Sequence, residues 1–372
     1  MTDRMGRVVL VTNEPIWPVR SGGTARMAGL VTALAGAHPA PVATIEPGLD
    51  AAAEHEGIER TPLAMAPSNP LTELLSPHPR LARTSLGGRP TDALDLVDDD
   101  TVVIVSHSYL APPLLAKGRS MVVDFPNVEV DRQRSLASMV AKVEAAKAKH
   151  WEPRVAEHAS LCLAVDLTEA ARLAAWGARV VIVPNAVDSI ENTPSPDQGP
   201  AVVVANATYG PNAEGLRWLV DEVWPLVRRQ HPKAELVIAG LATDTVVTSQ
   251  PAQGITVLGR VDDANELVRR AAVVLAPVRS GGGTQLKVVE ALAQGRAIVA
   301  TTYSSRSIPE GARSAAATAD TPADFAAATV TLLADLGQRR KREHILQAGT
   351  AVPTWDAAVQ PLVAELSRRR GR

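Results

Sequence analysis

The sequence has little of several residue types, and each shortage argues against a class of protein. A single cysteine, Cys162, occurs among 372 residues, so no disulfide can form within the chain. Aromatic residues make up only 3% of it, and no apolar run approaches the length of a transmembrane helix. The formal net charge of -2 lacks the basic excess of a nucleic-acid-binding protein. These shortages favour a globular, cytoplasmic protein that binds no nucleic acid, with Cys162 as a core residue.

Charge accumulates at one place, the tail Arg368–Arg372. We interpret it as a solvated terminus or, at most, a peripheral contact with a membrane surface. The N-terminus enters an apolar, strand-like run almost at once, so we expect no signal peptide. The sequence does not determine the oligomeric state, and a homodimer is one possible assembly.

Short apolar runs alternate with amphipathic stretches along the chain. The runs with strand character are 7–12, 42–45, 102–105, 121–123, 180–183, 201–205, 236–239, 255–258, 273–276 and 297–300. Runs of this kind, separated by helices, are typical of buried parallel sheets. Residues 189–200 are polar, contain three prolines and predict a linker. We therefore expect two similar α/β domains.

Three further stretches complete the pattern. Residues 68–90 are punctuated by proline and glycine and predict an irregular excursion. Residues 131–159 are rich in alanine and predict a helical region interrupted near Pro153, with a rough apolar stripe. The members of that stripe are Val143, Ala146, His150 and Trp151. A last stripe from Trp355 to Leu366 predicts a C-terminal helix.

A glycine run follows the buried strand 273–276. Gly281, Gly282 and Gly283 allow backbone angles closed to other residues and let a ligand approach the main chain. Thr284 can cap a helix whose core stripe is Leu286, Val289 and Ala293. Free amides and the positive end of a helix dipole together predict an anion site.

Two charged residues sit just after this run. Lys287 lies in the first helical turn and suits a phosphate, and Glu290 lies one turn on, on the same face. A carboxylate there can accept hydrogen bonds from a ribose diol, and phosphate plus diol indicates a nucleotide. The alternative is a glycine-rich turn beside a surface ion pair. Neither the P-loop pattern nor the dinucleotide fingerprint is present.

The N-terminal half offers its own polar candidates. The pair Gly22–Gly23 lies in the turn between the first strand and a helix. His107 follows the strand 102–105, at a carboxyl end, as a sugar or acceptor contact or else as a structural histidine. Asn127 and Glu129 follow the next strand, and Glu129 is either an acceptor contact or base, or a helix-start charge.

Several segments resemble the retaining glycosyltransferase family 4, in its glycine-rich-loop subgroup. The strongest piece runs from Gly281 to Thr301 and ends in Glu-Ala-Leu-Ala-Gln-Gly-Arg-Ala-Ile-Val-Ala-Thr. The segment Pro184-Asn185-Ala186-Val187-Asp188 is similar to the family's Pro-Asn-Gly-Val-Asp. Further matches are Pro211-Asn212 with Trp218 and Pro225, and the pair Gly22–Gly23. The resemblance covers nearly the whole chain.

The resemblance implies the GT-B fold, an α/β architecture of two Rossmann-like doubly wound domains facing a central cleft. An acceptor-binding domain would span 1–190, completed by a C-terminal helix at 354–372 that crosses back to it. A nucleotide-sugar-binding domain would span 191–353. The implied reaction moves a sugar from a nucleotide-diphosphate sugar to a hydroxyl or amine acceptor, with retention of configuration and without a metal or other cofactor.

The family's site residues carry over only in part. Glu290 matches the family's ribose ligand, and Gly22–Gly23 match its phosphate loop. The donor set we predict is Gly22, Gly23, Arg260, Gly281, Gly282, Gly283, Thr284, Lys287 and Glu290. We predict catalytic roles for His107, Glu129 and Lys287, and acceptor contacts for His107, Asn127 and Glu129.

Three departures from the family pattern affect this assignment. Gly282 stands where the family has a first glutamate that contacts the donor sugar. The segment Asn206–Gly215 replaces the usual Arg and Lys, so phosphate charge has to come from Lys287, or from Arg279 or Arg260. Pro126 replaces a histidine of the family.

The sequence leaves the substrates and two other functions open. A small-molecule or natural-product acceptor is favoured, and a glycan acceptor stays open. A nucleotide-sugar 2-epimerase and a non-catalytic, nucleotide-binding partner of a glycosyltransferase are the alternatives. The acidic run Asp98–Asp100 precedes a strand and reads as a solvated turn rather than a metal site.

Overall fold

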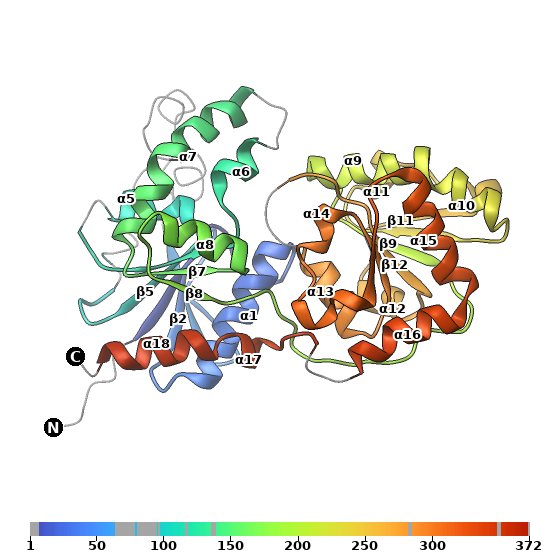
Figure 1. The fold of residues 1–372 in the computed structure, drawn as a ribbon. Helices are drawn as coiled ribbons and strands as arrows, with labels where there is room; N and C mark the ends of the chain where they lie inside the picture. Colours follow the sequence, from blue (N-terminus) through green and yellow to red (C-terminus); the bar gives the residue numbers. More distant parts are fainter. Residues whose placement is uncertain are drawn as a thin grey trace. The chain divides into compact units, whose positions relative to one another are not determined.

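The computed structural model describes residues 7–63, 79, 95, 97–115, 118–134, 139–281, 285–347 and 351–370. The chain divides into two compact units (Figure 1). The first unit combines Met1–Asn185 with Trp355–Arg372, and the second is Ala186–Thr354. The excursion expected at 68–90 lies outside the described residues, apart from Pro79.

An eight-stranded sheet forms the centre of the first unit, in the order β3-β4-β2-β1-β5-β6-β7-β8. Its strands are β1 (Val8–Val11), β2 (Val42–Pro47), β3 (Ala53–His55), β4 (Ile58–Leu63), β5 (Val102–Ser106), β6 (Val122–Phe125), β7 (Leu161–Ala164) and β8 (Val180–Ile182). All neighbouring pairs are parallel except β3 with β4. Val8 of β1 lies opposite Val42 on one side and Val102 on the other, so the order of the strands reverses at β1.

Helices cover this sheet. They are α1 (Gly22–Ala37), α5 (Ala111–Leu115), α6 (Glu129–Arg134), α7 (Met139–His158), α8 (Leu167–Ala175), α17 (Trp355–Ala358) and α18 (Gln360–Arg370). α1 begins earlier than expected, since Ser21 is its N-cap and exchanges hydrogen bonds with Thr24. Gly22 and Gly23 are therefore the first two residues of the helix, not part of the turn before it. Across the described ranges, no helix is both long and apolar enough to cross a membrane.

The helical region around residue 153 corrects two expectations. α7 continues through Pro153 without a break, although proline removes one hydrogen bond of the helix ladder. Buried side chains on both sides of it, Trp151 and Val155, hold the helix against the sheet. Of the expected apolar stripe only Trp151 is buried; the other three members are exposed, and the buried face instead contains Ala141, Ala145 and Ala148.

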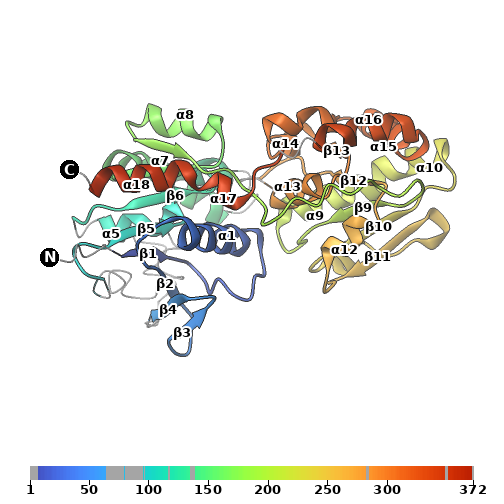
Figure 2. The same cartoon turned by 90° about the horizontal axis from the view of Figure 1, so that it is seen from below.

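The last two helices belong to the first unit, as the expected return of the chain requires. α17 and α18 pack beside α1 (Figure 2). A Cβ added at Gly29 of α1 would lie 2.1 Å from the indole ring of Trp355. Glycine at position 29 therefore makes room for the tryptophan that docks the C-terminal segment.

The second unit is built on a six-stranded sheet in the order β11-β10-β9-β12-β13-β14. Its strands are β9 (Ala201–Val204), β10 (Leu236–Ala239), β11 (Ile255–Gly259), β12 (Val273–Ala276), β13 (Ile298–Ala300) and β14 (Ala316–Thr318). Every neighbouring pair is parallel. Its helices are α9 (Gly210–Trp218), α10 (Trp224–Gln230), α11 (Thr243–Val246), α12 (Ala264–Arg269), α13 (Leu286–Ala293), α14 (Thr302–Ser305), α15 (Pro322–Ala334) and α16 (Leu336–Leu346).

Both faces of this sheet are covered, as the continuous apolar runs predict. Val203 and Leu275 belong to a core shared with Leu216, Trp224 and Phe325 from α9, α10 and α15. The alternate strand residues are buried as well, and α12 packs on α13. The stripe expected for the helix after the glycine run is confirmed, since Leu286, Val289 and Ala293 are all buried.

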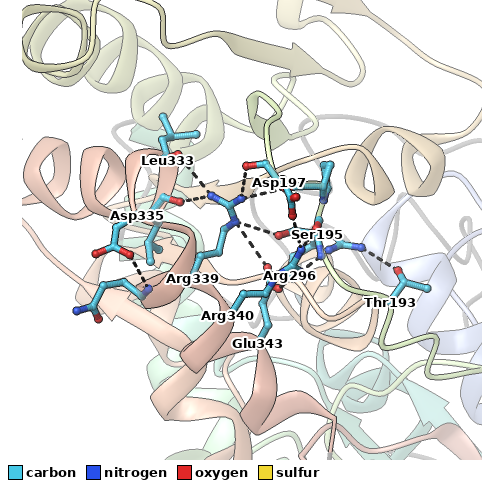
Figure 3. Close-up of polar contacts among 12 residues, drawn as sticks. Thr193, Ser195, Asp197, Arg296, Leu333, Asp335, Arg339, Arg340 and Glu343 are labelled. Atoms are coloured by element: carbon cyan, nitrogen blue, oxygen red, sulfur yellow. Dashed lines mark hydrogen bonds and ion pairs between the residues drawn. The ribbon is translucent and has the colours of Figure 1, made fainter.

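Residues 189–200 are not a free linker. Arg339 of α16, fully buried, donates to Ser195 Oγ at 3.0 Å and to the carbonyls of Pro196 and Asp197 at 2.9 and 2.8 Å (Figure 3). Arg296 donates to Thr193 Oγ1 at 2.8 Å. The prolines were interpreted as a linker because composition does not reveal these distant arginine partners.

Candidate functional site

The sheet of the second unit reverses its strand order between β9 and β12. A recess of about 580 Å³, including space open to solvent, lies there. Its lining includes Val204 and Ala205 at the end of β9 and Ala276 and Pro277 at the end of β12. Ligands of parallel α/β sheets bind beyond the carboxyl ends of the strands at such a reversal. We call this recess the strand-end pocket.

Lys287 and Glu290 both line the strand-end pocket. They lie one turn apart on α13, and Lys287 Nζ is 2.7 Å from Glu290 Oε2. The side chain of Lys287 is 51% exposed and that of Glu290 24%. An ammonium and a carboxylate are thus available at the rim of one pocket, close to the positive end of a helix. The arrangement suits a ligand that carries both a phosphate and a diol.

Only part of the glycine run falls within the described residues. Gly281 has a φ of 130°, and a Cβ there would lie 2.8 Å from the hydroxyl oxygen of Tyr209. Position 281 therefore requires glycine. Gly282, Gly283 and Thr284 lie outside the described residues, so their predicted donor contacts stay predictions, whereas the capping role expected of Thr284 is wrong, because Gln285 holds the N-cap position. α13 begins at Leu286, with Gln285 as its N-cap, and Gln285 N donates to Ser307 Oγ at 2.6 Å.

The other two arginines considered for phosphate lie elsewhere in this unit. Arg260 follows β11, is exposed, and is not among the residues that line the strand-end pocket. Arg279 lies with its guanidinium 5.2 Å from the ring centre of Trp218, a cation–π arrangement. It lines a second recess together with Glu214 and Ser280. Lys287 is the one predicted phosphate cation that the described part of the chain brings to the strand-end pocket.

Asn212 and Asn265 line the same pocket and were missed by the sequence analysis. Asn212 Nδ2 donates to the Asn206 carbonyl at 2.8 Å, and Asn265 Oδ1 accepts from Gln294 Nε2 at 3.1 Å. Asn212 lay within a quoted segment, but nothing local assigned its amide a role. Asn265 carries no sequence signal, since only the packing of α12 on α13 brings it to the pocket.

The first unit has a reversal of its own, between β1 and β5. His107 follows β5, and a Cβ at Gly23 of α1 would lie 3.7 Å from His107 Nε2. The imidazole therefore lies against the first turn of α1. The structure brings together two candidates, His107 and the glycine pair, that are more than eighty residues apart in the chain.

The surroundings of His107 favour a neutral imidazole. Burial lowers the pKa of His107, while the carboxylates of Asp124 and Glu129 oppose that shift less strongly. Its ring stacks on Tyr109 with centres 5.2 Å apart. Nδ1 of His107 is buried and has no hydrogen-bond partner among the described residues. A neutral imidazole can donate or accept a hydrogen bond according to its tautomer.

Asn127 and Glu129 are brought into direct contact. Asn127 Nδ2 donates to Glu129 Oε1 at 2.7 Å, and Arg132 Nε lies 2.9 Å from both carboxylate oxygens of Glu129. The side chain of Glu129 is 3% exposed. Both carboxylate oxygens of Glu129 are thus already occupied by side chains of its own segment. Glu129 also begins α6, which is the helix-start position considered as the alternative.

A buried ion pair behind these residues was also missed. Arg26 of α1 donates from Nη2 to Asp124 Oδ1 at 2.7 Å and from Nε to Oδ2 at 3.1 Å. The carboxylate of Asp124 also accepts from Ser106 Oγ. The sequence contains a hint of such a pair, because Arg26 lies next to the apolar stripe of its own helix. A charged side chain buried there needs a partner of opposite charge.

The fold and the strand-end pocket define a two-domain α/β protein with the architecture of GT-B enzymes. An α,α-trehalose-6-phosphate synthase from Burkholderia multivorans superposes with a TM-score of 0.69 at 12% identity, covering 99% of both chains. An E. coli trehalose-6-phosphate structure bound with UDP-2-fluoro glucose superposes at 0.66 and 13% identity, covering 98% of this chain and 99% of that one. At such identities the likeness shows the fold alone.

Sequence comparison gives the family. Residues 200–335 match the model of the glycosyl transferases group 1. The phosphatidyl-myo-inositol mannosyltransferase of Mycolicibacterium smegmatis is 28% identical over 206 residues, covering 52% of this chain and 53% of that protein. The chain thus aligns with about half the length of this curated relative. The match over residues 200–335 places this part of the second unit among the group 1 glycosyl transferases, and with the mannosyltransferase relative it supports the resemblance to family 4.

Proposed function

We propose that the protein transfers a sugar from a nucleotide-diphosphate sugar to a hydroxyl or amine acceptor, with retention of configuration. The observation that carries the proposal is the position of Lys287 and Glu290 together at the strand-end pocket, at the reversal of a parallel sheet. A metal is not part of the proposed reaction.

In the proposed donor complex, Glu290 accepts hydrogen bonds from the ribose diol and Lys287 contacts the diphosphate. The diphosphate is the leaving group, so negative charge grows on it as the glycosidic bond to the nucleotide breaks. A cation and amides fixed in advance stabilise that charge without reorganisation. Gly22, Gly23, Arg260, Gly281, Gly282, Gly283 and Thr284 remain predicted donor contacts, although the exposed position of Arg260 adds no support.

His107 is proposed to contact the transferred sugar or the acceptor through its neutral imidazole. Asn127 and Glu129 are proposed acceptor contacts, and the hydrogen bonds of Arg132 to both carboxylate oxygens of Glu129 hold that side chain in a fixed orientation. The named activities of the relatives, a mannosyl transfer to phosphatidyl-myo-inositol and the synthesis of trehalose phosphate, support a polyhydroxylated acceptor. We propose a small-molecule acceptor, such as a natural product or a free glycan.

The function is tested by incubating the protein with a panel of UDP-, GDP-, ADP- and dTDP-sugars and polyhydroxylated acceptors, followed by mass spectrometry. We expect one donor to give a product heavier by one sugar. Lys287→Ala should reduce the rate at least about tenfold, since it removes a charge from the developing diphosphate. Arg313→Ala, which removes an exposed cation of a similar i,i+3 pair with Glu310, should leave the rate unchanged.

Other outcomes would contradict the proposal. Conversion of a donor without any acceptor would indicate a nucleotide-sugar 2-epimerase. Tight donor binding without turnover across the panel would indicate a non-catalytic partner subunit. A product formed equally fast by Lys287→Ala and the parent protein would remove Lys287 from the site.

A further inference from the structure

The guanidinium of Arg26 makes four hydrogen bonds, and the two not yet described reach a distant part of the chain. Nη1 donates to the Val183 carbonyl at 3.1 Å and to Asn185 Oδ1 at 3.0 Å. The side chains of Arg26 and Asp124 are 3% and 0% exposed. Arg26 therefore binds the end of β6 through Asp124 and the segment after β8 through Val183 and Asn185.

A third strand end is bound through Asp124. Ser106 Oγ, at the end of β5, donates to Asp124 Oδ2 at 3.1 Å. The ends of β5, β6 and β8 and the first turns of α1 thus meet around one guanidinium. Arginine suits this position, because its planar fork satisfies a carboxylate and neighbouring oxygens in fixed directions, which a lysine ammonium cannot do.

A contribution to stability does not by itself explain why Arg26 and Asp124 are buried here. Taking an ion pair out of water costs free energy, and apolar residues of similar volume often serve a core equally well. What the pair adds is fixed geometry, since each hydrogen bond defines a direction. The bound segments are also the ones that bear the candidate site residues of this unit.

The connections are short. His107 directly follows Ser106, and Gly22 and Gly23 lie one helical turn before Arg26 on the same helix. A Cβ at Gly23 would touch the His107 imidazole at 3.7 Å. Asn185 is the last residue of the first unit before the chain enters the second. The guanidinium therefore fixes the distance between β5 and α1, which is the distance between His107 and the glycine pair.

We propose that Arg26 is a positioning residue. Through Asp124 and Ser106 it holds the His107 imidazole against the first turn of α1, and through Val183 and Asn185 it fixes the point where the chain leaves the first unit. The inference rests on the proposed function only where it concerns catalysis, because the position of His107 can be measured without any substrate.

The test variant is Arg26→Lys, which keeps the charge but removes the fork. Imidazole NMR resonances of histidine-labelled protein report on His107 directly, with the His107 signal assigned from its loss in His107→Gln. We expect the His107 resonances to shift and broaden and its titration midpoint to move in Arg26→Lys. In the transfer assay, kcat should fall about 10- to 100-fold, the loss typical of a misplaced reacting group, with the KM for the donor changed less than about threefold.

Arg60→Lys is the matched control. Arg60 also forks onto a buried carboxylate in this unit, with Nε and Nη2 2.9 and 2.7 Å from the oxygens of Glu46. We expect Arg60→Lys to lower the unfolding midpoint much as Arg26→Lys does, while leaving the His107 resonances in place. Equal disturbance of His107 in both variants would reduce the Arg26 effect to general loosening and overturn the proposal.

Ser106→Ala covers the case in which Arg26→Lys does not fold. It removes one hydroxyl that donates to Asp124 and should shift the His107 resonances in the same direction, with a smaller loss in kcat. Unchanged His107 resonances in folded Arg26→Lys or folded Ser106→Ala would overturn the inference. If the donor panel gives no product, the proposed function fails, yet the NMR comparison still decides the positioning role.

Discussion

Gly29 and Gly36 lie on the same helix, α1, but differ in what surrounds them. A Cβ at Gly29 would lie 2.1 Å from Trp355, whereas one at Gly36 would have nothing within 4 Å. We predict that Gly29→Ala lowers the free energy of unfolding by about 1–3 kcal/mol, because the added methyl group overpacks the contact that docks α17.

The matched substitution Gly36→Ala should instead raise the free energy of unfolding by about 0.5–1 kcal/mol, since alanine loses less backbone entropy than glycine in a helix. Urea unfolding of both variants, followed by circular dichroism, measures the two effects. Similar values for the two variants would show that Trp355 does not press on α1 as described.

Local spacing was enough to predict part of the site. Lys287 and Glu290 are three residues apart, so a helix places them on one face, and the structure brings their charged atoms to 2.7 Å. The pair Arg26 and Asp124 could not be predicted in this way, because 98 residues separate its members. The position of Arg26 near the apolar stripe of α1 indicates that it needs an acidic partner, but nothing in the sequence indicates that this partner is Asp124.

Glu152 of α7 shows how one element fixes the start of another. Its carboxylate accepts from the backbone N–H groups of Glu129 and Val130 at 2.6 and 2.9 Å, and so caps the N-terminus of α6. Burial raises the pKa of Glu152 to about 8, although the two N–H donors act against this shift. The element that presents Glu129 therefore depends on a titratable group.

The sign of the resulting pH dependence follows from linkage. The pKa in the folded state is about 8 against an ordinary value of 4.5, so between these values the folded protein binds more protons than the unfolded chain. The contribution of Glu152 to stability is therefore greatest below about pH 4.5 and is lost as the pH rises to about 8, by a few kcal/mol at most.

We predict that Glu152→Gln flattens the fall in unfolding free energy between pH 5 and pH 8, as measured by urea unfolding at several pH values. Glu157→Gln, a change of an exposed carboxylate on the same helix, should keep the slope of the parent protein. An unchanged slope in Glu152→Gln would contradict the raised pKa.

Among the elements, the buried strands of continuous apolar residues could be predicted, as for β10 and β12. The strands β3 and β4 could not, because β3 is a short Ala-Glu-His segment whose first two residues are exposed, and β4 contains charged residues and Pro62. β7 (Leu161–Ala164) and β14 (Ala316–Thr318) consist largely of leucine and alanine, which favour helix as readily as strand, and they lack the Val and Ile that mark β10 and β12. Their pairing with an existing sheet, not their own composition, makes them strands.

At the scale of the whole molecule, the two units share one organisation. In each sheet the strand order reverses beside the first strand, between β1 and β5 and between β9 and β12, and the candidate residues gather at these reversals. The sequence indicated two α/β halves, but it did not indicate which strands become neighbours, since that pairing is non-local. Nor did it indicate that residues 193–197 are bound by Arg339 and Arg296 (Figure 3).

The central claim is that the strand-end pocket binds a nucleoside diphosphate through Glu290 and Lys287. Isothermal titration calorimetry of the full chain with UDP, GDP, ADP and dTDP tests it most directly. We predict that at least one of them binds and that Glu290→Ala weakens it about tenfold or more, the usual loss for hydrogen bonds to a charged group, while Glu310→Ala, an exposed carboxylate of a similar pair, binds as the parent does. Absence of binding by the parent protein, or equal binding by Glu290→Ala, would contradict the account.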